Sequence, residues 1–150
     1  MNGSLSASAV TVESSGILSG TGTVGGITAL SGGTVAPGNS IGKLTLQFES
    51  AAALVFDSGG NYHWELADAA GTAGTGWDLI HVAGTVDVAA LASVDNTFNI
   101  TLHTIDQYGA SGYAANFNPH LPASWAILTA TSITNFDPAK FHVFADSTTF

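Results

Sequence analysis

Five histidines, His63, His81, His103, His120 and His142, are the side chains in this sequence best suited to bind a transition metal. The first three are spaced by 18 and 22 residues, which could stack them on successive turns of a regular fold and create a Zn²⁺ or Cu²⁺ site. No close ligand pair such as H-x-H or H-x-x-x-H occurs. Three of them, His63, His81 and His142, alternate with apolar residues that would point into a core. We therefore interpret the histidines as solvent-facing strand residues.

Carboxylates offer a second kind of chemistry. Asp57, Glu65, Asp68 and Asp78 are close in sequence, and their oxygens could bind Ca²⁺. The sequence lacks both the glycine-rich nonapeptide of calcium-binding β-rolls and the EF-hand loop. Asp57, Asp68 and Asp78 remain candidate ligands of a structural Ca²⁺, and no other cofactor is predicted.

Paired carboxylates could also hydrolyse a polysaccharide if an acid and a base flanked a sugar cleft. The acidic residues are instead scattered singly, as on a solvated surface, and no Arg is present to neutralise a uronate. We predict no catalytic residues.

Exposed aromatic rings could bind sugars by stacking. Trp77, Tyr108 and Tyr113 lie in loop-like sequence and are candidate glycan contacts, whereas Trp64 and Trp125 follow the inward phase of their strands. A carbohydrate-binding adhesin is therefore the alternative function.

The amino-acid composition excludes several classes of binding partner. The 150 residues include 9% charged residues, well below the roughly 25% of typical soluble proteins, and the net charge is -9. Lys43 and Lys140 are the only basic residues apart from histidine, so we expect no nucleic-acid partner. The longest apolar runs are too short to cross a bilayer, so we expect no membrane insertion. Cys is absent, and no signal peptide begins the sequence.

The elements that must position these residues are predicted to be strands. Val10, Ile27 and Leu44 recur at intervals of 17 residues, and Leu18 meets Val35 at the same interval. Such a unit fits one coil of a β-solenoid with glycine turns. Further segments in which apolar and polar residues alternate surround Leu46, Trp64, Ile100 and Val143. Another such segment contains Trp125 and Ile127, and two more flank a predicted turn at Ala83-Gly84.

These patterns predict an all-β fold, a right-handed parallel β-helix in a single domain over 1–150. Recognisable repeats span 10–48, and less regular coils continue over 49–150 with a loop near 67–76 and an insertion near 107–123. A β-sandwich is the alternative for the C-terminal half. The predicted core residues are Val10, Leu18, Val24, Ile27, Val35, Ile41, Leu44, Leu46, Leu54 or Val55, Tyr62, Trp64, Ile80, Val82, Phe98 and Ile100.

One motif resembles a known family. The run Gly32-Gly-Thr-Val-Ala-Pro-Gly-Asn-Ser-Ile-Gly-Lys-Leu44 is similar to the core of the autotransporter-associated β-strand repeat, also called the passenger-associated transport repeat. The segment Gly76-Trp-Asp-Leu-Ile-His-Val-Ala-Gly-Thr-Val86 resembles the sequence that usually follows it, and later blocks resemble large secreted proteins with Pro-Glu-Pro sorting tails. The resemblance implies a β-helical stem, without known catalytic residues, in a protein exported to the bacterial surface or released from it.

The predicted function is a non-enzymatic, extracellular structural protein, a stem or filament subunit. Neither the start of the repeats nor residues 147–150 has the charge or helical pattern of a solenoid cap. We therefore expect other copies of the chain to bind head-to-tail. A surface polysaccharide is a further expected partner.

Overall fold

The computed structural model describes residues 2–48, 52–93 and 95–145, and this part of the chain is built from strands without an α-helix. The prediction of an all-β protein is confirmed. The elements are β1 (Ser4–Val12), β2 (Ile17–Gly20), β3 (Thr23–Ala29), β4 (Thr34–Pro37), β5 (Lys43–Leu46), β6 (Ala52–Phe56), β7 (Asn61–Leu66), β8 (Leu79–Val88), β9 (Phe98–Thr104), β10 (Leu128–Thr134), the 3-10 helix η1 (Pro138–Lys140) and β11 (Phe141–Ala145).

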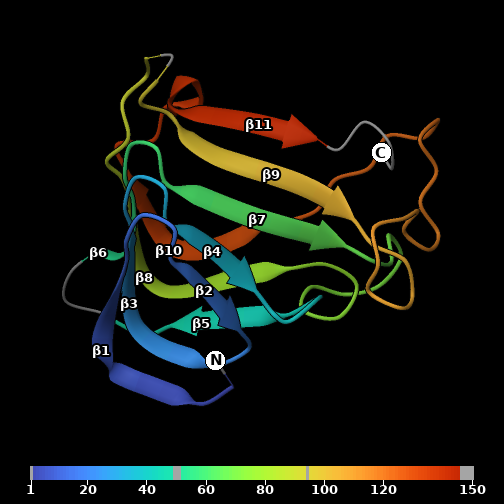
Figure 1. Ribbon diagram of the computed structural model, residues 1–150, viewed down its shortest axis with the longest axis horizontal. Helices are drawn as coiled ribbons and strands as arrows, with labels where there is room; N and C mark the ends of the chain where they lie inside the picture. The colour runs from blue at the N-terminus through green and yellow to red at the C-terminus, as the bar shows by residue number, and fades with distance from the viewer. Residues whose placement is uncertain (1, 49–51, 94, 146–150) are drawn as a thin grey trace.

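The strands form two sheets, and every pair of named strands that is hydrogen-bonded is parallel (Figure 1). One sheet, sheet A, runs in the order β1-β3-β5-β8-β10, and β6 occupies the same position as β5, between β3 and β8. The other, sheet B, runs β2-β4-β7-β9-β11. The chain returns alternately to the two sheets, and each return adds a strand beside the previous one. The C-terminal strands join the same two sheets, so a separate β-sandwich there is wrong.

Apolar side chains form columns that run across the strands on the inner face of each sheet. In sheet A, the register pairs Val10 with Ile27, Ile27 with Leu54, Leu54 with Val86 and Val86 with Ile133. In sheet B, a second column consists of Leu18, Val35, Tyr62, Ile100 and Val143. Because side chains alternate across a strand, one apolar residue in each strand settles which face is buried.

The 17-residue interval holds only between the first two strands of each sheet. Val10 pairs with Ile27 and Leu18 with Val35 at this interval, as predicted. Leu44 does not continue the column, because Leu54 lies beside Ile27 and Leu44 lies beside Ile80. The later intervals are longer, and the last reaches 47 residues between Val86 and Ile133. The added residues lie mainly in loops between strands, including the predicted loops near 67–76 and 107–123.

Two local predictions are wrong for a shared reason. Ala83-Gly84 is not a turn between two strands but part of the continuous strand β8, where the register to β10 shifts and the neighbouring strand on the other side changes from β5 to β6. The strand predicted around Trp125 and Ile127 begins only at Leu128. Alternation of apolar residues marks the buried face but does not show whether a chain bends or ends at a small residue.

The core lies between the two sheets. Most of the predicted core residues are buried, among them Tyr62, Trp64 and Phe98. Leu54, rather than Val55, is the buried member of its pair, and Val10, Leu18 and Ile41 are only partly buried. Phe56 and Phe98 stack with ring centroids 4.1 Å apart, and the ring of Phe141 packs edge-on against both.

Candidate functional site

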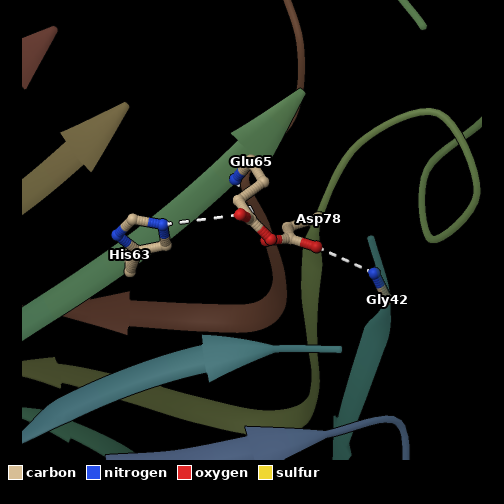
Figure 2. Close-up of polar contacts among 4 residues, drawn as sticks. All are labelled: Gly42, His63, Glu65 and Asp78. Carbon is tan, nitrogen blue, oxygen red and sulfur yellow. Dashed lines mark hydrogen bonds and ion pairs between the residues drawn. The ribbon is translucent and has the colours of Figure 1, made fainter. Parts of the chain in front are cut away.

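Asp78 is the one fully buried carboxylic acid of the described chain (0% exposed), and it lies immediately before β8. Its Oδ1 accepts a hydrogen bond from the Gly42 N–H at 2.8 Å (Figure 2), and its Oδ2 accepts one from the Glu65 N–H at 3.0 Å. The Asp78 N–H donates to the Glu65 carbonyl at 3.0 Å, and the indole Nε1–H of Trp64 donates to the Asp78 carbonyl at 2.8 Å. Asp78 therefore joins β7, β8 and the residue preceding β5.

The protonation of Asp78 reflects this burial. Desolvation raises the pKa of its carboxyl to about 8, the two backbone N–H groups oppose that rise, and the nearby charge of Glu65 adds to it. Tyr62 is buried beside the same cluster. Its pKa is raised well above the ordinary value, mainly by burial and secondarily by the charge of Asp78. A buried carboxyl with a raised pKa is a common property of catalytic acids, but structural clusters show it too.

The contacts of Asp78 are those of a structural corner. Both carboxylate oxygens bind backbone N–H groups of other coils, and the residue is enclosed. The outer end of the cluster is Glu65, whose Oε1 lies 3.7 Å from Nε2 of His63 (Figure 2).

Four of the five histidines, His63, His81, His103 and His142, lie on strands, whereas His120 lies in a turn between β9 and β10. His63 and His103 lie on the neighbouring strands β7 and β9 with ring centroids 5.7 Å apart. Two of the three histidines that were considered as a stacked metal site are therefore neighbours. His81 lies on β8 in the other sheet, where its Nδ1 is 2.9 Å from the Thr129 hydroxyl. Over residues 2–48, 52–93 and 95–145, no three His, Asp or Glu side chains are grouped so as to hold a metal ion.

The other two calcium candidates lie in separate loops. Asp57 accepts a hydrogen bond from the Ser58 N–H within its own turn at 2.8 Å. Asp68 accepts from the Asn116 amide at 2.7 Å and from the Ala70 N–H at 3.0 Å, and these two bonds lower the pKa of its exposed carboxyl. The structure therefore does not bring the three candidates into one site, and calcium binding stays a prediction.

The three candidate glycan contacts differ in exposure. Trp77 is partly buried, and its Nε1–H donates to the Ala126 carbonyl at 3.2 Å. Tyr108 and Tyr113 lie in the loop after β9 and are 84% and 78% exposed. Only the two tyrosines present free ring faces of the kind that could stack on a sugar.

Sequence reasoning missed one motif of the kind that surrounds a catalytic serine. Gly38-Asn39-Ser40-Ile41-Gly42 has the G-x-S-x-G pattern of a serine hydrolase nucleophile. In such enzymes the serine sits between a strand and a helix, whereas this segment connects the strands β4 and β5, and its Gly42 N–H is held by Asp78. The motif here is a turn of the fold.

An apolar cavity of about 380 Å³ opens at the end of the stack formed by β10 and β11. Tyr62, Ile100 and Phe141 line it from sheet B, and Val86, Leu128 and Ile133 line it from sheet A. Sequence reasoning missed this cavity because it depends on which coil comes last in the described stack.

No helix of the described chain is long and apolar enough to span a bilayer.

Comparison with known proteins gives one partial similarity. No family model matches the chain, so membership of the autotransporter-associated repeat family is not shown. The chain is 48% identical over 62 residues to an extracellular serine protease of Serratia marcescens. The match covers 41% of this chain but only 6% of the protease, so the chain spans a small part of that relative. The chain is therefore related to a segment of a large extracellular bacterial protein.

Proposed function

We propose that this protein is a non-enzymatic structural segment of an exported bacterial protein, folded as a right-handed parallel β-solenoid that serves as a stem. The main support is the continuity of the apolar columns, which run from Val10 to Ile133 in sheet A and from Leu18 to Val143 in sheet B. Each coil buries its apolar face against its neighbours, which is how solenoids extend as rods. The right-handed sense follows from the strong preference of parallel crossover connections.

The extracellular location of the stem is supported by the similarity to the Serratia extracellular protease. The low content of charged residues and the lack of Cys are compatible with that location but do not require it. The protease activity belongs to the relative, and the 6% of its length that is matched gives no reason to assign it here.

A structural role is also supported by what the polar residues bind. The buried carboxyl group of Asp78 accepts from two backbone N–H groups, Asp57 accepts from a group of its own turn, and Asp68 accepts from its own turn and from Asn116 in the loop after β9. Asp78 is also fully buried, so this carboxyl group does not face a surface from which a substrate could reach it.

The test is an activity screen of the purified chain with polysaccharides and casein. We expect no turnover. Polysaccharide turnover that disappears in Asp57→Asn or Asp78→Asn, or casein cleavage that disappears in Ser40→Ala, would contradict the proposal. Negative-stain microscopy supplies an independent measurement, because a stem should appear as a short rod or a filament.

A second function, a carbohydrate-binding adhesin, is favoured by one observation, the exposure of Tyr108 and Tyr113. The test is a glycan array with the wild type and with a Tyr108→Ala/Tyr113→Ala double variant. Binding that is lost in the double variant and kept in Trp77→Phe would support the adhesin and assign the contact to the loop. An array without binding would reject it.

A further inference from the structure

The connection between β9 and β10 is unusually long. Residues 105–127 contain no named strand, and this run exceeds the roughly 12–15 residues beyond which a connection without secondary structure is uncommon in a compact domain. In Figure 1 it extends past the ends of the sheet B strands, beside the loop that follows β7. Long connections of this kind are usually binding loops, lids or linkers, and the stacking of coils does not by itself require one.

This connection is fixed in place by hydrogen bonds to the loop that follows β7. The Ala69 N–H donates to the Ala115 carbonyl at 2.8 Å, and Asp68 and Ala115 form a parallel bridge. The side-chain amide of Asn116 donates to Asp68 at 2.7 Å, and the indole N–H of Trp125 donates to the Ala69 carbonyl at 3.3 Å. Two segments from different coils are therefore held together, and their side chains are positioned before any ligand arrives.

A cavity of about 360 Å³ lies between these two segments. Its volume is within the roughly 300–1,000 Å³ that is typical of small-molecule sites. Ala69 lines it from the loop after β7, and residues 116–118 and 121–125 line it from the long connection. It shares no lining residue with the apolar cavity of about 380 Å³ at the end of the stack. The site is therefore built from connections on the flank of the stack.

The polar groups of this flank cavity can both donate and accept hydrogen bonds. The Asn118 Oδ1 accepts from the His120 N–H at 3.0 Å, and its Nδ2 has no partner among the described residues. Asn116 uses its Nδ2 to bind Asp68, so its Oδ1 remains as an acceptor. The hydroxyl of Ser124 also has no partner within the part of the chain that the structure describes. A ligand with hydroxyl groups could bind all three.

The other lining side chains are apolar. The rings of Phe117 and Trp125 pack with centroids 6.0 Å apart, and Leu121 and Pro122 complete the apolar lining. None of the described residues that line the cavity is an Asp, Glu, Lys or His. A cation would therefore meet no lining carboxylate, and an anion would meet no Lys and would be repelled by the net charge of -9.

From these observations we infer that the flank cavity binds one neutral pyranose residue of a saccharide. The hydroxyl groups of the sugar bind the side chains of Asn116, Asn118 and Ser124, and its C–H groups contact the apolar lining. Apolar walls with a few placed amide and hydroxyl groups are the usual composition of a selective small-molecule site. This site goes beyond the proposed stem, and it uses neither Tyr108 nor Tyr113.

The first experiment measures binding of the purified chain to immobilised oligosaccharides of glucose, galactose or mannose, with a glucuronate polymer as the charged comparison. We expect a neutral saccharide to bind and the glucuronate polymer not to bind. The Asn118→Ala/Ser124→Ala double variant should bind about tenfold more weakly, because each lost hydrogen bond should weaken binding about two- to tenfold. Asn39→Ala, at an exposed asparagine in the turn between β4 and β5, is the matched control and should bind like wild type.

The variants must be folded for this comparison. The circular dichroism spectrum and urea midpoint of each must match the wild type, and Ser124→Ala alone replaces the double variant if that protein does not fold. The inference is overturned if no neutral saccharide binds, if the double variant binds as tightly as wild type, or if glucuronate is preferred. Binding that is lost only in Tyr108→Ala/Tyr113→Ala would assign the sugar to the tyrosines and would also overturn it.

A second experiment places the bound saccharide by NMR. Each tryptophan gives one indole N–H resonance, and a Trp125→Phe variant assigns that of Trp125. Addition of the saccharide should shift the Trp125 resonance, because this N–H binds Ala69 at the cavity, and should leave that of Trp64, which binds the Asp78 carbonyl in the core. An unchanged Trp125 resonance at saturation would overturn the site. Enzymatic turnover would instead overturn the proposed function and leave the binding result unchanged.

Discussion

Asp78 and Gly42 are 36 positions apart in the chain, yet the carboxylate Oδ1 of Asp78 accepts a hydrogen bond of 2.8 Å from the Gly42 N–H in the buried corner between coils. The other oxygen binds the Glu65 N–H. One side chain therefore satisfies two backbone donors that have no strand partner at that point, which a stack of coils needs wherever the chain turns from one sheet to the other.

Replacing Asp78 should destabilise the protein according to how many of these bonds are lost. Asp78→Asn keeps one acceptor and leaves one buried N–H unpaired, which should cost about 1–3 kcal/mol of unfolding free energy, and Asp78→Ala should cost about twice as much. Urea denaturation at pH 4, where the raised pKa of Asp78 costs wild type little, measures both. The surface control Glu13→Gln, at an exposed residue, should leave the urea midpoint unchanged. Equal stability of Asp78→Ala and wild type would show that the buried bonds contribute nothing.

Stability should also depend on pH through Asp78. The pKa of its carboxyl is raised from an ordinary 3.8 to about 8 in the folded state, so folding favours the protonated form. The stabilising contribution of Asp78 to the free energy of unfolding is complete below pH 3.8 and is lost as the pH rises toward 8. We expect the urea midpoint of wild type to decrease as the pH is raised from 5 to 9. The dependence of the midpoint on pH should be weaker in Asp78→Asn. Asp68 acts in the opposite direction at acid pH because its pKa is lowered, so the range above pH 5 isolates Asp78.

Gly38 in the Pro-Gly turn should tolerate no side chain. Its φ is +87°, and a Cβ there would collide with the Ser40 carbonyl and with Ile41. Gly38→Ala should cost at least about 1–3 kcal/mol from the left-handed conformation alone. Gly3→Ala, where a Cβ meets open space, is the control and should be neutral. Thermal unfolding followed by circular dichroism compares the two, and a Gly38→Ala variant as stable as wild type would contradict the turn geometry.

Tyr62 should hold the long loop before β10 in place. Its buried hydroxyl donates a hydrogen bond of 2.9 Å to the Ile127 carbonyl, 65 residues later. Tyr62→Phe should lose about 1–2 kcal/mol of stability and increase proteolytic cleavage between residues 105 and 127. Tyr108→Phe, which changes an exposed ring in that loop, is the matched control. Limited proteolysis followed by mass spectrometry locates the cuts, and unchanged cleavage would show that the bond does not restrain the loop.

Local patterns were sufficient to predict that the protein is all-β and to predict most of its core. Alternation around Tyr62, Trp64 and Ile100 identified both the strands and their buried faces, because a half-buried strand repeats its environment every second residue. The first interval of 17 residues was also predicted correctly from Val10 and Ile27. Where loops of variable length separate the strands, the interval is not periodic, and Leu54 rather than Leu44 continues the column.

By itself the sequence determined that this protein is built from strands, has few charges and buries one face of each strand, since these properties depend on residues next to each other. Only the tertiary structure decided which strands are neighbours, that Asp78 is buried against Gly42 and Glu65, and that an apolar cavity lies at the β10–β11 end. The physical reason is that these features arise from contacts between residues tens of positions apart. The loops that bring such residues together can vary in length at little entropic cost, so their lengths carry no signal of the pairing.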